Sequence, residues 1–186
     1  MSAMRRGLLC FLLVVSCLLL SAVPATPVQP VMPVPPVRAF PGLQFIVNRA
    51  GLIFSGTVVS VERVRASRPN EIETVQVRFR VEQPVRGAKV GQIISIREWG
   101  GLWVGRPRYE VGQRLMLFLY PPSKLGLTSP IPGFGNLPVD RQGWLRPSPG
   151  QQRVLDDSGM LSRVPIRSGH ITARDFARML RGSAVE

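Results

Sequence analysis

The most constraining feature of this chain is a strict alternation of apolar and polar residues at positions 72–82, which read IETVQVRFRVE. Val75, Val77, Phe79 and Val81 occupy one set of alternate positions, and mainly polar and charged residues occupy the other. Successive side chains of a β-strand point to opposite faces of a sheet, so this pattern predicts a strand with one buried and one solvated face. Such strands are typical of antiparallel sheets.

Three further segments fit the same sheet. Residues 52–64 predict a long strand, in which Gly56 indicates a bulge or a bend. Residues 92–99 predict a shorter strand, and residues 114–120 (RLMLFLY) are apolar on both faces, which favours a central position in the sheet. The fold class that follows is mainly β.

The chain after Pro122 is richer in proline and glycine and predicts weaker elements. Residues 142–146 and 152–166 are interpreted as two short strands, the second of them broken by a hairpin turn at Asp157-Ser158-Gly159. A short helix is expected at the C-terminus, where Thr172 can cap its first turn. The apolar stripe that should pack this helix on the sheet consists of Phe176, Met179 and Leu180.

The N-terminus has the features of a secretory signal. Arg5 and Arg6 precede an uncharged apolar run at positions 7–23, and the sequence Val23-Pro24-Ala25 predicts cleavage after Ala25. A retained anchor helix is the alternative, since the 17 residues of the run reach the lower limit for spanning a bilayer. Both alternatives place the rest of the chain in the periplasm or outside the cell, because the two positive charges precede the run.

Cysteine usage favours a bacterial envelope. Both cysteines, Cys10 and Cys17, lie within the signal, so the rest of the chain has none. An exported domain without disulfides is typical of bacteria, and the absence of cysteine excludes thiol catalysis and cysteine-based metal sites. The sequence Val14-Val15-Ser16-Cys17 also resembles a lipobox, so lipidation at Cys17 is a third fate of the signal.

Residues 26–41 form a proline-rich segment. Prolines fall at every third position from 24 to 36, which matches the three residues per turn of polyproline II. We interpret the segment as a semi-rigid spacer. A docking ligand for an aromatic groove is the alternative.

The chain is strongly basic, with 24 Lys+Arg against 11 Asp+Glu. Nearly all the cations are arginines, and they are spread along the chain and interleaved with acids. This distribution favours the codon bias of a GC-rich genome as its cause. Binding of an anionic envelope polymer or of nucleic acid is the alternative.

Residues 97–113, REWGGLWVGRPRYEVGQ, are the strongest candidate for a contact surface. A strand rather than a helix follows the glycines, so a phosphate-binding loop is not indicated. Gly100-Gly101 is interpreted as the hairpin connection between the strands at 92–99 and 114–120. Aromatic side chains interleaved with arginines at the rim can form a stacking platform and charged groove for nucleic acid or, alternatively, cap the open end of a small barrel. The candidate contact residues are Trp99, Trp103, Arg106, Arg108 and Tyr109.

The sequence shows no catalytic constellation. His170 is the only histidine, and no Gly-x-Ser-x-Gly motif occurs. Asp156 and Asp157 are adjacent and would point apart in a strand, and no cofactor fingerprint or metal-ligand spacing is visible. We therefore expect no catalytic residues, no cofactor and no metal. A hydrolase that uses His170 is the alternative.

Three stretches carry a resemblance to a known family: AGLIFSGTVVSVE at 50–62, VQVRFRVEQPVRG at 75–87 and YEVGQRLMLFL at 109–119. They resemble small exported bacterial domains of the netrin/tissue-inhibitor-of-metalloproteinase type. The resemblance implies an OB-like barrel of five strands. It does not extend to the inhibitors' mechanism, since those proteins chelate a protease zinc through an N-terminal cysteine that this chain lacks after its signal.

Together these observations predict a mainly β fold, a small antiparallel OB-like barrel with a short C-terminal α-helix. The expected segments are a signal peptide (1–25), the spacer (26–41), the barrel domain (42–140) and a β-hairpin with the C-terminal helix packing on the barrel (141–186).

The expected function is non-catalytic binding or assembly in the bacterial envelope, with an envelope protein as the partner. An inhibitor-like binder of an exported protease and an arginine-rich binder of anionic polymer or nucleic acid are the alternatives. Membrane contact is expected only through the signal, an anchor or a lipid at Cys17.

Overall fold

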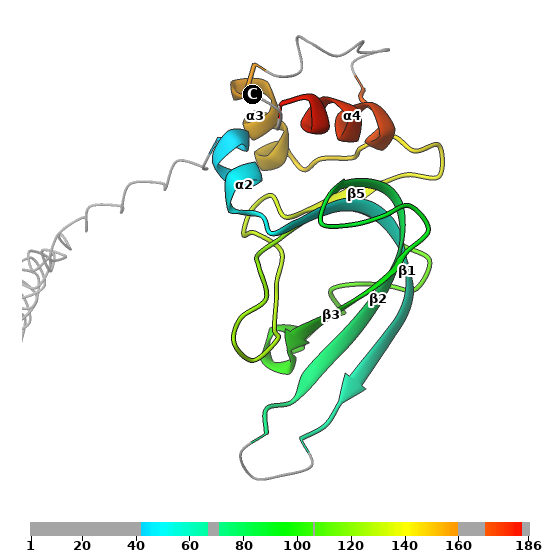
Figure 1. Ribbon diagram of the computed structural model, residues 1–186, viewed down its shortest axis with the longest axis vertical. Coiled ribbons are helices and arrows are strands. Elements are labelled where there is room, and N and C mark those ends of the chain that lie inside the picture. Colours follow the sequence, from blue (N-terminus) through cyan, green and yellow to red (C-terminus); the bar gives the residue numbers. More distant parts are fainter. Residues whose placement is uncertain (1–41, 67–70, 106, 160–169, 184–186) are drawn as a thin grey trace, which may run out of the picture. The chain divides into compact units, whose positions relative to one another are not determined.

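A long, irregular strand, β1 (Leu52–Val64), organises the fold (Figure 1). It pairs antiparallel with β2 (Thr74–Arg86) along its length, and its first half also pairs with β4 (Arg114–Leu119). β3 (Ile93–Trp99) adds to β2, and β5 (Asn136–Val139) adds to β4, which gives the strand order β3-β2-β1-β4-β5. The predictions of a mainly β, antiparallel fold and of a central strand near 114–120 are confirmed.

The computed structural model describes residues 42–66, 71–105, 107–159 and 170–183, all of which belong to one compact unit, 39–186. The predicted signal, the cleavage site after Ala25, Cys17 and the spacer lie outside the described residues. Within the described ranges, no helix is long and apolar enough to cross a membrane.

One face of the sheet carries the first of two core clusters. It includes all four apolar residues of the alternating stretch in β2, together with Phe54 and Val58 of β1. The ring of Phe79 packs edge-on against Phe54 at 5.8 Å and against Tyr109 at 5.5 Å. The alternation read from the sequence therefore identified this core correctly.

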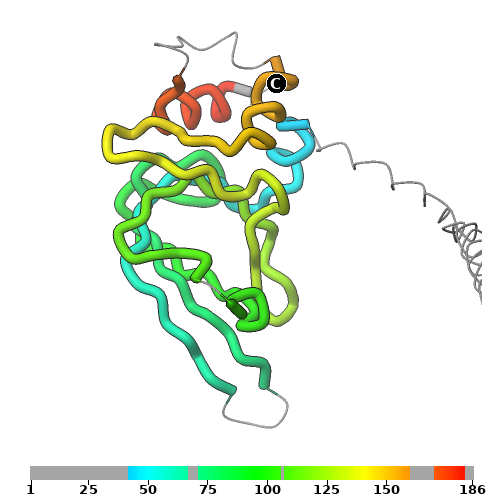
Figure 2. Tube along the Cα trace, turned by 180° about the vertical axis from the view of Figure 1, so that it is seen from behind, coloured from blue at the N-terminus to red at the C-terminus, as the bar shows by residue number. Residues whose placement is uncertain are grey.

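The second core cluster lies between β1, β4 and β5 and three helices (Figures 1 and 2). The helices are α2 (Leu43–Arg49), α3 (Pro149–Asp157) and α4 (Ala173–Ser183). β4 contributes to both clusters, with Leu115 and Leu117 on one face and Met116 and Phe118 on the other. This two-sided burial explains why the strand is apolar on both faces.

The C-terminal helix forms as expected. Thr172 accepts a hydrogen bond from the Asp175 backbone N–H at 3.1 Å and donates its hydroxyl to the Asp175 carboxylate at 2.8 Å. Phe176 and Leu180 are buried in the second cluster, and Met179 is partly buried against it. The stripe thus packs this helix on the rest of the domain.

Two predictions about the segments outside the confirmed strands are wrong, and the first concerns the two strands expected after Pro122. Residues 149–157 form α3 rather than part of a strand at 152–166, because Ser148 and Gln151 make a reciprocal capping box with proline in the first turn. Around 142–146 only isolated bridges occur, at Trp144 and Leu145. The predicted turn at 157–159 is the end of α3, and residues 160–169 lie outside the described part of the chain.

The second wrong prediction is the hairpin at Gly100-Gly101, expected to join the strands at 92–99 and 114–120. Residues 100–103 form a short 3-10 helix, η1 (Gly100–Trp103). Among the described strands, β3 pairs with β2 alone, while β4 pairs with β1 and β5. The two strands are on opposite sides of the β1–β2 pair, so no tight turn can join them.

The sheet is not closed into a barrel, because its outer strands β3 and β5 do not pair. One backbone hydrogen bond, from the Thr128 N–H to the Arg97 carbonyl at 2.9 Å, connects the segment before β5 to β3. The same segment is bonded to the end of β4, where the Tyr120 N–H donates to the Ser129 carbonyl at 3.1 Å.

Gly56 lies at a shift in the β1–β2 register, as the sequence indicated. A Cβ at this position would lie 2.5 Å from the Arg80 carbonyl oxygen, which belongs to the backbone of the paired strand. We therefore expect Gly56→Ala to lower the free energy of unfolding by about 1–3 kcal/mol, because the strands must move apart. Urea unfolding measures this loss. Gly182→Ala, whose added Cβ meets nothing within 4 Å, is the control, and equal stability of the two variants would contradict the prediction.

Candidate functional site

A fully buried carboxylate, Glu98, lies near the start of the stretch 97–113 and contacts three of its other residues. Its side chain is 0% exposed and points to the same side of β3 as Ile94 and Ile96. The indole N–H of Trp103 donates to Oε2 at 3.0 Å, and the hydroxyl of Tyr109 donates to Oε1 at 3.2 Å. Arg108 Nε lies 3.4 Å from Oε2 and supplies the opposite charge. We call these four residues the Glu98 cluster.

Burial dominates the electrostatics of the Glu98 cluster. It raises the pKa of Glu98 above the ordinary value, although Arg108 and the two hydrogen bonds act in the opposite direction. Burial also raises the pKa of Tyr109, and the neighbouring Glu98 charge adds to this shift. Tyr109 therefore stays a protonated donor to the carboxylate.

The Glu98 cluster corrects the predicted contact surface at two residues. Trp103 and Tyr109 are only 7% and 2% exposed, because both turn inward to bond Glu98 and to pack on the first core cluster. Their rings lie 5.7 Å apart and help to line a hollow of about 640 Å³ with Val61, Pro107 and Val111 among its walls. They are buried as part of the first core cluster and do not form an exposed rim.

The other predicted contact residues differ from one another. Trp99 is 53% exposed, and its ring lies over Gly101, where an added Cβ would be 2.5 Å from the indole. Arg108 is partly exposed and is engaged by Glu98. Arg106 lies outside the described residues. Of the predicted set, Trp99 is thus the described residue that offers a largely exposed surface.

The exposed face of β2 and β3 carries a row of arginines that no sequence motif marks. Arg78, Arg80 and Arg97 are exposed, and they alternate with the buried residues of their strands. None of the three takes part in an ion pair with any described residue. We call these three arginines the basic face.

Three acids lie near the basic face, and one of them, Glu71, lines the same hollow as Arg97. Glu62 of β1 lies opposite Gln76 on the same side of the sheet. Glu82 is already bonded to Arg114 and Thr57, and these bonds outweigh burial and hold the pKa of Glu82 below its ordinary value. The alternation in β2 contained the signal for this face, since it places both of its arginines on the solvated side.

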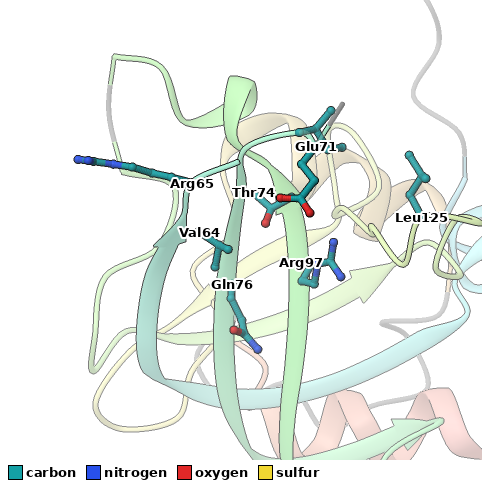
Figure 3. A pocket seen from close by; sticks show the side chains of 8 residues that line it. Val64, Arg65, Glu71, Thr74, Gln76, Arg97 and Leu125 are labelled. Atoms are coloured by element: carbon teal, nitrogen blue, oxygen red, sulfur yellow. The ribbon is translucent and has the colours of Figure 1, made fainter. Parts of the chain in front are cut away.

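A hollow of about 600 Å³ continues from the basic face at the start of β2 and the end of β3 (Figure 3). Arg97, Gln76 and Thr74 line it from the two strands, and the Glu71 side chain lies beside them. Arg65 extends away from the other labelled side chains. Its apolar walls are Val64, Ile72 and Leu125, which are 47%, 44% and 66% exposed. Exposed apolar side chains around a cationic group are typical of a contact surface.

The residues considered for catalysis lie apart along the chain from both features. His170 precedes α4, and its ring centroid is 6.4 Å from that of Trp144. Asp156 and Asp157 end α3. Among the described residues, no group of three or more histidine, cysteine, aspartate or glutamate side chains is arranged to hold a metal ion.

Comparison with protein-family models, with curated proteins and with solved structures finds no match for this chain. The basic face and its hollow are therefore the features whose chemistry bears on the function.

Proposed function

We propose that this chain is an exported, non-catalytic binding protein of the bacterial envelope that recognises an anionic partner through the basic face. The observation that carries the proposal is the unpaired state of Arg78, Arg80 and Arg97 in the described structure. Three like charges on adjacent strands repel one another, and an anionic partner relieves that repulsion.

The hollow beside Arg97 supports a protein as the partner. A uniform polyanion needs charge alone, whereas the exposed Val64, Ile72 and Leu125 offer an apolar surface next to the charge. Protein interfaces combine an apolar centre with complementary charge at the rim. Export and the bacterial envelope rest on the N-terminal signal and on the absence of cysteine from the rest of the chain.

We also propose that the domain is an OB-like barrel in a partly open form. The support is the position of β1, which is shared between β2 and β4, and the Thr128–Arg97 hydrogen bond, which reaches across the open side of the sheet. The resemblance of three sequence stretches to netrin-type domains is a further argument for this proposal.

The test is the binding of fluorescent poly-L-glutamate to the purified protein over a range of sodium chloride concentrations. Arg78→Ala/Arg80→Ala is expected to weaken binding about tenfold, since each exposed charge contact contributes up to about 1 kcal/mol. The double variant should also show a shallower dependence on salt, because fewer counterions are exchanged.

Arg153→Ala/Arg174→Ala is the matched control for this experiment. It removes the same charge from exposed positions of α3 and α4 and should bind poly-L-glutamate much as the unmodified protein does. Equal losses in the two double variants would show that net charge, rather than the basic face, attracts the polymer, and would reject the proposal.

A further inference from the structure

The hydrogen bonds of β3 show which of its backbone groups face away from β2. The Val81 N–H donates to the Gln92 carbonyl at 2.9 Å, and the Gly100 N–H donates to the Glu73 carbonyl at 2.8 Å. In an antiparallel pair, bonded positions recur at every second residue, so the even-numbered residues of β3 bond β2. The N–H and carbonyl groups of Ile93, Ser95 and Arg97 therefore point to the outer edge of the sheet.

This outer edge is almost unused within the described part of the chain. The Arg97 carbonyl accepts the Thr128 N–H, and no described residue bonds the edge groups of Ile93 or Ser95. The side chains of Ile93, Ser95 and Arg97 are all exposed. An exposed strand edge with unpaired backbone groups is a template for another extended segment.

The chain itself shows what the edge accepts. Residues 128–131 approach β3 at Arg97 and then bond β4, where the Ile131 N–H donates to the Phe118 carbonyl at 3.0 Å. The edge thus already accepts one backbone donor at its Arg97 end, while the Ile93 end is open. An added strand would extend the contact that Thr128 begins.

Charge decides between a second copy of this chain and a different partner. A second copy paired edge to edge would bring another basic face beside Arg78, Arg80 and Arg97, and like charges on adjacent strands are unfavourable. An acidic segment would place carboxylates beside these arginines. The residues of β3 that offer free backbone groups also carry their side chains on this face, so both interactions act on the same residues of the partner.

We infer that the outer edge of β3 binds an extended acidic segment of a partner protein as an additional antiparallel strand, with acidic side chains at alternate positions on the basic face. This inference rests on the proposed function and specifies its partner as a polypeptide. It adds a backbone interaction that a uniform anionic polymer does not make.

The probe is an acetylated, amidated peptide in which valine and glutamate alternate. It has about ten residues, the length of a long strand. Two derivatives serve as its controls: one is N-methylated on the glutamates, the other on the valines. With glutamate side chains on the basic face, the glutamate N–H groups are those that bond β3, so only the first derivative should lose binding, by about tenfold or more.

Ser95→Pro tests the same contact from the protein side. It removes an N–H that points to the free edge and leaves the hydrogen bonds between β3 and β2 in place. Proline is tolerated at such a position of an edge strand. We expect it to weaken peptide binding about tenfold or more, with Ser95→Ala unchanged. Should Ser95→Pro fail to fold, hydrogen exchange in the unmodified protein gives the same answer, since the peptide should slow exchange of the Ile93 and Ser95 amides.

Three results would overturn the inference: equal binding of all three peptides, no binding of any of them, or a dimer of the free protein that Ser95→Pro converts to a monomer. In each case, weaker poly-L-glutamate binding by Arg78→Ala/Arg80→Ala would still support the proposed function. If poly-L-glutamate does not bind either, the proposed function fails as well.

Discussion

Glu98→Ala is expected to lower the free energy of unfolding by about 3–5 kcal/mol, the range for breaking a buried charged network by removing one member. The substitution leaves the Trp103 indole N–H and the Tyr109 hydroxyl without their acceptor inside the protein. It also removes the partner of Arg108 and leaves a cavity. Urea unfolding followed by tryptophan fluorescence measures the loss, with Trp103 beside the changed residue.

Glu98→Gln separates hydrogen bonding from charge. The amide keeps the shape of the side chain and an acceptor for one of the two donors, so we expect a much smaller loss than for alanine. Equal losses in the two variants would show that the hydrogen bonds of the Glu98 cluster contribute little to stability.

Comparison of Glu98→Gln with the unmodified protein also gives a prediction about the pH dependence of stability. Because the pKa of Glu98 is raised in the folded state, the folded protein binds more protons than the unfolded chain between the ordinary value of 4.5 and the raised value. The contribution of Glu98 to stability is therefore present below pH 4.5 and is lost as the pH rises through this window. Glu98→Gln lacks this dependence, so its stability relative to the unmodified protein should increase with pH there.

Glu82 has the opposite dependence, because its pKa is lowered and its contribution is lost as the pH falls. It is present in both proteins, so its effect cancels in their difference. A difference that is flat or that falls with pH would contradict the raised pKa of Glu98.

The strands were predictable because their signal is local. β2 alternates strictly, and β4 is apolar on both faces, so burial alone assigns both strands. α3 also carried a local signal: Ser148 and Gln151 lie on either side of Pro149-Gly150, and Gln151, Val154 and Leu155 have helical spacing.

α2 had no such signal. It has seven residues, no side-chain N-cap and several residues that favour strands. Its last carbonyls are instead bonded by the Arg86 guanidinium, which reaches Val47 at 2.6 Å and Ala50 at 2.9 Å from β2. A helix that is stabilised by contacts with residues far away in the sequence, such as Arg86, cannot be predicted from its own residues.

The candidate site was predicted in part for a related reason. The stretch 97–113 was chosen for its aromatic and basic composition, and composition does not say which way a side chain points. The even-numbered positions of β3 place Glu98 on the side of Ile94 and Ile96, which is the signal for a buried acid. Trp103 and Tyr109 then turn inward because a buried carboxylate requires donors.

Phe176→Ala is expected to lower the free energy of unfolding by about 3–5 kcal/mol, as for other phenylalanines removed from a core. Phe176 is 0% exposed, and its ring centroid lies 6.3 Å from that of Phe118, which also contacts Phe134. The substitution opens a cavity between α4 and the sheet that rigid neighbours on β4 cannot fill. Urea unfolding followed by far-ultraviolet circular dichroism and by tryptophan fluorescence measures the effect.

Arg174→Ala is the matched control, since it removes an exposed side chain from the same helix and should change stability by less than about 0.5 kcal/mol. Comparison of the unfolding transitions followed by circular dichroism and by fluorescence shows whether α4 contributes to the stability of the sheet. Coincident curves that shift together mean that the helix and the sheet unfold as one cooperative unit. If Phe176→Ala shifted only the helical signal, α4 would unfold separately, and the second core cluster would contribute little to the stability of the strands that carry the basic face.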